Sequence, residues 1–168
     1  ILRNTGFKNI WSQPDPGDGG TSIGAALYIY NTILGKKREY RLIDPYLGPE
    51  FSSTEIKKFL DSEGIKYSEF KTDKDLVEKT ADLIFENNVI GWFQGRMEFG
   101  PRALGGRSIL GDARSSTMQK TMNLKIKFRE SFRPFAPAVL AEKASEWFES
   151  DCKSPYMLFV VNVKNGKC

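Results

Sequence analysis

The sequence predicts an α/β protein, on three observations. Runs with the apolar spacing of amphipathic helices alternate along the chain with short apolar runs typical of strands, and glycine or proline separates most of them. With 168 residues and a 40% hydrophobic content, the chain is long and apolar enough for a packed core. No apolar run approaches the roughly 20 residues that a membrane-spanning helix needs.

The first elements are a loop and a helix. Residues 13–20, QPDPGDGG, are rich in turn residues, and residues 21–35, TSIGAALYIYNTILG, have helical spacing with Gly35 suited to the end. The polar stretch over residues 36–45 then marks a domain boundary, with a short strand and a Pro/Gly loop expected by residue 50.

The next region contains a helix with a recognisable start. Ser52 and Glu55 have the spacing of a capping box, so a helix is expected from there to about Ser62, and Gly64 suits its end. The alternating pattern of residues 65–70, IKYSEF, predicts a strand after this helix.

A second helix–strand pair follows. Thr72 or Asp73 is expected to cap a helix over residues 75–87, where the apolar side chains form one stripe. Residues 88–94, NVIGWFQ, are short, apolar and typical of a strand.

The last third repeats this alternation. Residues 107–113 predict a strand, and Ser116 with Gln119 gives a weaker capping signal for a helix over residues 118–126. Three further elements, a strand, a helix and a buried strand, are predicted at residues 134–140, 141–149 and 156–163.

Charge is concentrated between residues 93 and 137. This segment has nine basic and three acidic side chains, a net charge of +6, whereas the whole chain carries only +4. Six of the nine arginines lie in it: Arg96, Arg102, Arg107, Arg114, Arg129 and Arg133. Because a guanidinium stays charged and grips phosphate or carboxylate with two parallel donors, the cluster predicts a pocket for an anionic ligand.

Within this segment, the glycine-rich part GRMEFGPRALGGRS allows backbone and arginines to approach a ligand closely. Glu98 could orient one guanidinium or help to hold a magnesium ion. The alternative is a tight surface hairpin whose arginines are simply solvated.

In the second part, NLKIKFRESFRPFAP, aromatic and basic residues alternate. Phe128, Phe132 and Phe135 could stack on a base, but we expect them to be core residues. We expect function from Arg129 and Arg133, because neighbouring prolines fix the backbone beside them.

Three polar residues leave alternatives open. Asp112 is interpreted as a buried partner for an arginine, and Asn123 either caps a helix or binds a phosphate oxygen. Asp18, before the first predicted helix, suits either a phosphate-facing turn or a plain cap. The chain has no histidine, and Cys152 and Cys168 form no CxxC motif, so imidazole chemistry, a zinc site and a disulfide framework are not indicated. A reduced, cytoplasmic protein is the default.

Residues 91–114 and 123–137 together closely resemble the signature of the O-carbamoyltransferases, the family of the nodulation-factor, cephamycin and tobramycin carbamoyltransferases. Residues 13–27 and 46–56 are similar to the same family, in the expected order. The resemblance implies that residues 1–38 are the tail of an actin-like, sugar-kinase-type half. Residues 39–168 would then be most of a YrdC-like half with a twisted mixed sheet flanked by helices.

The resemblance also implies a reaction. Carbamoyl phosphate is cleaved, and the carbamate attacks ATP with Mg²⁺ to give carbamoyl adenylate and pyrophosphate. The carbamoyl group then passes to a hydroxyl of a small-molecule acceptor in the other half, which holds a metal, expected to be iron. The family's further C-terminal motifs are missing, so we expect the chain to be a catalytically incomplete part of a longer enzyme, with no membrane or nucleic-acid partner.

The residues expected to serve this chemistry fall into three sets. The catalytic anion contacts are Arg96, Arg102, Arg107, Arg129 and Arg133. The substrate- and nucleotide-binding residues are Glu98, Gly100, Gly105, Ser108, Asn123 and Lys127. Asp18 is the metal ligand expected in the actin-like half. The family commonly has Asn where Gly106 stands, which predicts a positive φ there.

Two other functions remain open from the sequence. One is a YrdC-like enzyme that makes threonylcarbamoyl adenylate, or a hydrogenase-maturation carbamoyltransferase. The other is an RNA-binding module, in view of a pI near 9.0 and the interleaved aromatic residues.

Overall fold

The structure, a computed structural model, describes residues 4–150 and 153–166. Both cysteines, and hence the expectation placed on them, lie outside the described residues. Within those residues the helices are α1 (Thr21–Tyr28), α2 (Ser53–Ser62), α3 (Asp73–Phe85), α4 (Met118–Thr121) and α5 (Ala144–Trp147), and the strands are β1 (Ile90–Phe93) and β2 (Arg107–Leu110). The predicted α/β class is therefore confirmed.

The first helix follows the prediction closely. A 3₁₀ turn over Asp18–Gly20 leads into α1, which continues as a π-helical turn over Ile29–Ile33. Gly35 then takes a φ of +61°, the left-handed conformation that suits a residue just beyond a helix.

Side-chain caps fix the starts of the next two helices. In α2 the Ser52 hydroxyl accepts the Glu55 N–H at 3.2 Å, while the Glu55 carboxylate accepts the Ser52 N–H at 2.8 Å, which is the predicted capping box. In α3 the Thr72 hydroxyl accepts the Asp75 N–H at 3.1 Å. Both helix starts are thus set by contacts within four residues.

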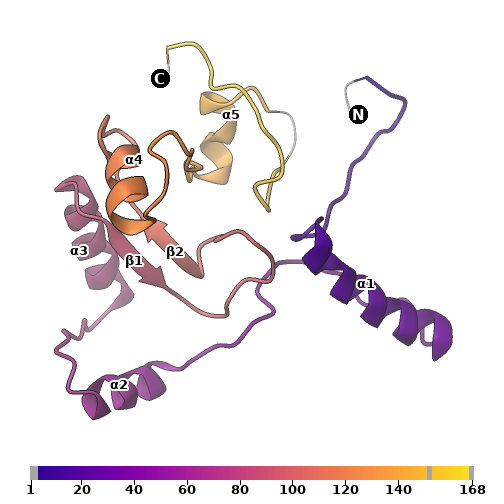
Figure 1. Cartoon of the computed structure of the whole chain (residues 1–168), viewed down its shortest axis with the longest axis horizontal. Helices are drawn as coiled ribbons and strands as arrows, with labels where there is room; N and C mark the ends of the chain where they lie inside the picture. Colours follow the sequence, from indigo (N-terminus) through magenta and orange to yellow (C-terminus); the bar gives the residue numbers. More distant parts are fainter. Residues whose placement is uncertain (1–3, 151–152, 167–168) are drawn as a thin grey trace.

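The two strands pair antiparallel, with Ile90 opposite Leu110 and Phe93 opposite Arg107. Figure 1 shows this pair next to α3 and α4, with the long β1–β2 connection reaching toward the start of α1. A small core lies where α4 covers the end of β2. A Cβ atom on Gly111 would come within 2.9 Å of the side chains of Met118 and Met122, both of which are buried.

Several predicted strands are absent from the described residues. Residues 36–50, 65–70 and 134–140 contain no strand, and residues 156–163 contribute only a single bridge, between Val163 and Phe148. A strand pattern is not enough without a pairing partner, and the prolines of PFAPAVL remove backbone donors that a ladder needs.

Two local predictions near these elements were partly wrong. The helix over residues 118–126 forms as α4 followed by a π-helical turn, Met122–Ile126, but its N-cap is Thr117 and no side chain caps it. The helix expected over residues 141–149 is shorter, with a 3₁₀ turn over Ala141–Lys143 before α5.

None of the helices in the described part of the chain combines the length and apolar character needed to cross a bilayer. The two-domain division at residue 38 and the YrdC-like and actin-like assignments stay predictions.

Candidate anion-binding site

The long connection between β1 and β2 holds the first group of predicted site residues. Its two ends are tied together, because the Gln94 N–H donates to the Gly106 carbonyl at 2.8 Å just beyond the paired strands. Between them the connection packs on residues 45–49. The Phe99 N–H donates to the Pro45 carbonyl at 2.6 Å, and the Gly48 N–H donates to the Met97 carbonyl at 2.8 Å.

Glu98 organises this connection from its centre. The side chain is 8% exposed, and its Oε1 accepts the backbone N–H groups of Leu104 at 2.8 Å, Gly106 at 2.6 Å and Arg107 at 3.2 Å. Burial raises the pKa of the Glu98 carboxyl, but these N–H groups and its own backbone N–H lower it by more, so the pKa lies below its usual value. Glu98 is therefore an ionised anchor for the backbone of the loop. The sequence had suggested a guanidinium or magnesium partner instead.

The glycines of the loop have different conformations. Gly100 and Gly105 have φ values of +107° and +111°, whereas Gly106 is not in the left-handed region, so the prediction for Gly106 was wrong. Its small size is needed for another reason. An added Cβ atom would lie 2.7 Å from the Arg96 carbonyl oxygen and 3.1 Å from the Glu98 carboxyl.

The other loop residues predicted from sequence also make contacts inside the protein. Ser108 Oγ accepts the Gly105 N–H at 3.0 Å, which holds the turn. Gly100 lies against residue 14, where an added Cβ atom would meet the Pro14 carbonyl oxygen at 3.0 Å. The QPDPGDGG loop before α1 is therefore in contact with the arginine-bearing connection.

Arg96 and Arg107 direct their guanidinium groups at backbone carbonyls. Arg96 donates to the carbonyls of Tyr46 and Leu47 at 3.0 and 3.3 Å. The Arg107 guanidinium carbon lies 3.5 Å from the centroid of the Phe93 ring. The carbonyls that accept from Arg107 are those of Gln94, Gly95, Gly106 and Pro49. These contacts lock the loop to its surroundings, and the predicted anion-binding role of both arginines stays a prediction.

Arg102 differs from these two. It lies in the exposed turn after Gly100, and its guanidinium makes no hydrogen bond or ion pair within the described residues. Within residues 4–150 and 153–166, therefore, no protein group occupies its donors.

The second group of predicted residues surrounds Asn123 in the π-helical turn after α4. Asn123 is fully buried, and its Oδ1 accepts the Arg129 Nε–H at 2.6 Å. Its Nδ2 donates to the carbonyls of Ser131 and Arg133 at 3.2 and 2.8 Å. The Arg129 guanidinium carbon also lies 4.8 Å from the centroid of the Phe135 ring.

The remaining cations of this group are exposed. Lys127 and Arg133 have no side-chain hydrogen bond or ion pair in the part of the chain that the structure describes. Phe128 and Phe132 are also exposed, at 85% and 76%, so the expectation that they are core residues was wrong. Phe128 has a φ of +49°, which is unusual for a bulky side chain.

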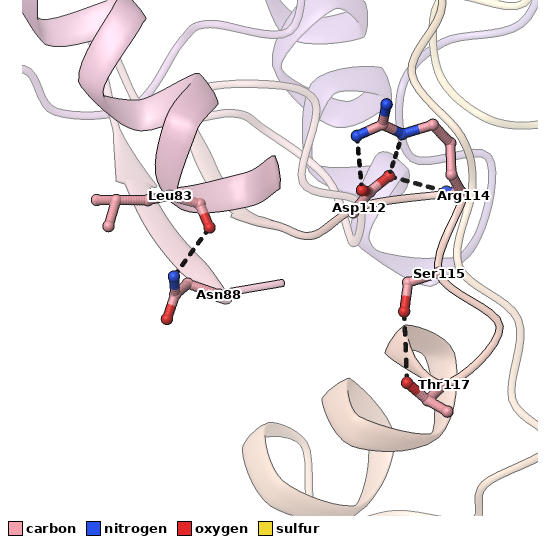
Figure 2. Close-up of polar contacts among 6 residues, drawn as sticks. All are labelled: Leu83, Asn88, Asp112, Arg114, Ser115 and Thr117. Carbon is pink, nitrogen blue, oxygen red and sulfur yellow. Dashed lines mark hydrogen bonds and ion pairs between the residues drawn. The ribbon is translucent and has the colours of Figure 1, made fainter. Parts of the chain in front are cut away.

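Asp112 has the arginine partner that the sequence suggested. Its oxygens accept from Arg114 Nε at 2.9 Å and Nη2 at 2.8 Å, as Figure 2 shows, and its side chain is only 11% exposed. The Arg114 side chain and backbone N–H lower the pKa of Asp112 to about 2. An open hollow of about 420 Å³ adjoins the pair, lined by Phe85, Asn87, Asp112, Arg114, Ser115 and Ser116.

Two contributors escaped the sequence analysis. Tyr46 donates its hydroxyl to the Leu104 carbonyl at 2.8 Å, and Gln119 Nε2 donates to the Arg133 carbonyl at 3.0 Å. The sequence offered only their positions near the motifs as a signal. Asp18, the predicted metal ligand, is exposed, and no cluster of three potential ligand side chains exists among the described residues.

The structure thus brings the predicted residues into two groups, one around Glu98 and one around Asn123. No hydrogen bond, ion pair or ring contact between described residues joins the two groups. Each group combines a fixed backbone with guanidinium donors, a combination that suits an anionic ligand, and anion binding by these loops stays a prediction.

Comparison with known proteins identifies the family. The family described as "Carbamoyltransferase C-terminus" matches residues 81–168, which include both groups. The chain is 41% identical to the nodulation protein NolNO of Sinorhizobium fredii over 99% of its length and 25% of the relative's. It is 39% identical to the nodulation protein NolO of Bradyrhizobium diazoefficiens, over 96% of its length and 30% of the relative's.

An uncharacterized protein of Synechocystis is 54% identical over 98% of the chain and 28% of the relative's length. The chain belongs to the carbamoyltransferase family. It spans less than a third of the length of these relatives.

Proposed function

We propose that this chain supplies the anion-binding loops of an enzyme that transfers a carbamoyl group from carbamoyl phosphate to a hydroxyl, with carbamoyl adenylate as the intermediate. The observation that carries the proposal is the match of the carbamoyltransferase C-terminus to residues 81–168. This part of the chain contains the arginines whose guanidinium donors have no hydrogen-bond partner among the described residues. Those arginines are Arg102 and Arg133, together with the Nη groups of Arg129.

The proposed reaction needs positive charge more than a nucleophilic side chain. Hydrolysis of carbamoyl phosphate releases phosphate and carbamate, and a carbamate oxygen attacks the α-phosphorus of ATP with loss of pyrophosphate. The acceptor hydroxyl then attacks the carbamoyl carbon and releases AMP. Carbamate and ATP are both anions, so fixed guanidinium groups lower the barrier by offsetting their repulsion and by aligning them.

The geometry supports different roles for different residues in this chemistry. Arg102, Arg129 and Arg133 offer free donors to phosphate oxygens, while Glu98 fixes the loop that carries Arg102. The exposed rings of Phe128 and Phe132 offer a surface on which adenine can stack, and neighbouring cations favour such stacking. Mg²⁺ keeps several waters and is usually held by substrate phosphates with one or two carboxylates, so we expect it to enter bound to ATP.

The exposed surface supports the proposal that further protein covers this chain. Its accessible area is 13,690 Å², whereas a compact monomer of 19.0 kDa has roughly 8,400 Å². In α1 and the following turn the exposed residues include Leu27, Tyr30 and Ile33. A helix that is apolar on all sides is normally buried. We therefore retain the proposal that residues 1–38 belong to an actin-like half with its own metal, expected to be iron, and the acceptor.

The test uses lysine substitutions in the purified enzyme that contains this chain. Arg129→Lys and Arg133→Lys keep the charge but lose the two-pronged donor, so ATP–pyrophosphate exchange that depends on carbamoyl phosphate should fall about tenfold or more. Arg41→Lys is the matched control, because Arg41 is exposed and forms no hydrogen bond or ion pair with other described residues.

Unchanged exchange in both variants would remove these arginines from the site. Absence of any such exchange in the wild-type enzyme would overturn the proposed adenylate chemistry. Calorimetry with ATP, Mg²⁺ and carbamoyl phosphate then shows whether the 168-residue chain binds the ligands by itself.

A further inference from the structure

We infer that Asn123 is a positioning residue, which aims the Arg129 guanidinium and holds the Ser131–Arg133 backbone without touching the ligand. This inference rests on the proposed function, because it assigns the way in which one of the anion-binding arginines is held. The sequence had suggested that Asn123 itself binds a ligand.

The burial of Asn123 is the first reason. Its side chain has no exposed surface, and each of its polar groups already has a partner inside the protein. Two donors on Nδ2 serve two carbonyls, and Oδ1 serves the Arg129 Nε–H. A carboxamide with this set of contacts has no donor left for a substrate.

The contacts also define the orientation of the carboxamide. If the group were rotated by 180°, Nδ2 would face the Nε–H donor of Arg129, and Oδ1 would face the carbonyl oxygens of Ser131 and Arg133. Both arrangements are repulsive, so only the observed orientation satisfies all three neighbours. An aspartate at residue 123 could satisfy the arginine but would place an oxygen opposite both carbonyls.

The guanidinium of Arg129 is consequently held on two sides. Its Nε is bound to Asn123 at 2.6 Å, and its central carbon lies over the Phe135 ring, 4.8 Å from the centroid. The two Nη groups have no hydrogen bond within the described residues, and they form the edge that grips a phosphate or carboxylate with two parallel bonds. Fixing the guanidinium in advance lowers the entropy lost when an anion binds.

The position of Asn123 in the chain fits this role. It lies in the π-helical turn Met122–Ile126, and such turns are frequent at functional sites. The Arg129 N–H donates to the Asn123 carbonyl at 3.0 Å, so main chain and side chain fix the same neighbour. Gln119, one helical turn earlier, donates to the Arg133 carbonyl at 3.0 Å and supports the same loop.

The experiment is a double-mutant cycle on the purified enzyme, read by carbamoyl-phosphate-dependent ATP–pyrophosphate exchange. Asn123→Asp preserves the shape of the side chain, replaces the two N–H donors of Nδ2 by an oxygen, and pairs a carboxylate with the Arg129 guanidinium, so ATP–pyrophosphate exchange should fall at least tenfold. In the Arg129→Ala background the same change should add less than the product of the two single losses, because the part of its effect that passes through Arg129 is gone, while the part on the Ser131–Arg133 backbone remains. Asn88→Asp is the control. Asn88 Nδ2 donates to the Leu83 carbonyl at 3.0 Å (Figure 2), and no hydrogen bond links Asn88 to the group around Asn123 within the described residues, so its effect should multiply with that of Arg129→Ala.

A second readout does not depend on activity. In the wild-type protein the Nε–H of Arg129 should exchange slowly with solvent in NMR spectra, and Asn123→Ala should make it exchange as fast as the Nε–H of Arg102. Losses that multiply in the cycle, or an unprotected Nε–H in the wild type, would overturn the inference. After either result the carbamoyltransferase proposal still holds, provided that Arg129→Ala lowers the ATP–pyrophosphate exchange. If Arg129→Ala leaves the ATP–pyrophosphate exchange unchanged, the assignment of Arg129 to the anion-binding site is wrong instead.

Discussion

Removal of the Glu98 charge should loosen the loop that carries Arg102, and the structure allows the size of this effect to be worked out. Oε1 of Glu98 accepts three backbone N–H groups, from Leu104, Gly106 and Arg107, at 2.8, 2.6 and 3.2 Å. A hydrogen bond to a charged group contributes about 1.5–3 kcal/mol, and a neutral one about 0.5–1.5 kcal/mol.

Glu98→Gln keeps a hydrogen-bond acceptor but loses the charge. The loss of stability should be about 1 kcal/mol for each of the two short hydrogen bonds and less for the long one. The expected total is therefore about 2 kcal/mol. Glu98→Ala leaves three donors without an acceptor. Of the three hydrogen bonds only the one from Gly106 is buried, and the other two are partly buried, so we expect about 3–4 kcal/mol for this variant.

The assay is amide hydrogen exchange of the loop. A loss of about 2 kcal/mol should make the Leu104 and Gly106 amides exchange about 30-fold faster in Glu98→Gln. The matched control is Glu50→Gln, because Glu50 is exposed and has no hydrogen bond or ion pair within the described residues. If both amides of a folded Glu98→Gln variant exchange with solvent at the wild-type rate, the reasoning is refuted.

The same carboxylate gives the loop a pH dependence of known sign. Because the pKa of Glu98 is lower in the folded protein than its usual value, its contribution to stability is fully present above that usual pKa. The contribution is lost as the pH falls through the folded pKa. In Glu98→Gln this acid-dependent loosening should disappear.

Two further predictions concern the glycines at 106 and 111 and the ion pair of Asp112 with Arg114. Gly106→Ala should destabilise the protein markedly, by about 1–3 kcal/mol, because the new methyl group meets a backbone carbonyl oxygen. Gly111→Ala meets only flexible methionine atoms and should cost less, which urea denaturation of the two variants will compare. The Asp112 carboxyl should titrate near a pKa of about 2 by NMR and move up toward its ordinary value in Arg114→Gln. If Asp112 titrates identically in both proteins, its bonds to Arg114 are not the cause.

The parts of the fold that could be predicted from sequence depend on near neighbours. The capping box of Ser52 and Glu55, the Thr72 cap and the Asp112–Arg114 pair all join residues within three positions of one another. Such contacts are specified by the local residue types. The strands predicted at residues 88–94 and 107–113 form as β1 and β2, which pair with each other, whereas residues 65–70 and 134–140 have strand-like patterns but no neighbouring strand to pair with.

For the candidate site, too, the local sequence predicted some features, whereas others depend on contacts between distant segments. The arginine cluster predicts an anion-binding segment, but the sequence could not show which guanidinium groups donate to backbone carbonyls inside the protein. Arg96 and Arg107 donate to carbonyls of residues 46–49, about 50 positions earlier in the chain. Glu98 is surrounded by arginines in sequence, yet backbone N–H groups surround it in space. Both outcomes depend on how distant segments pack.

These contacts explain how a strongly basic segment can present a focused charge. Of its three acids, Glu98 is held by backbone N–H groups, Asp112 is paired with Arg114, and Glu130 forms no ion pair with any described residue. A bound anion would therefore meet Arg129 and Arg133 without a competing carboxylate on the same guanidinium. Anion binding here should depend on the geometry of the donors as much as on the net charge, and the comparison of arginine with lysine separates these two contributions.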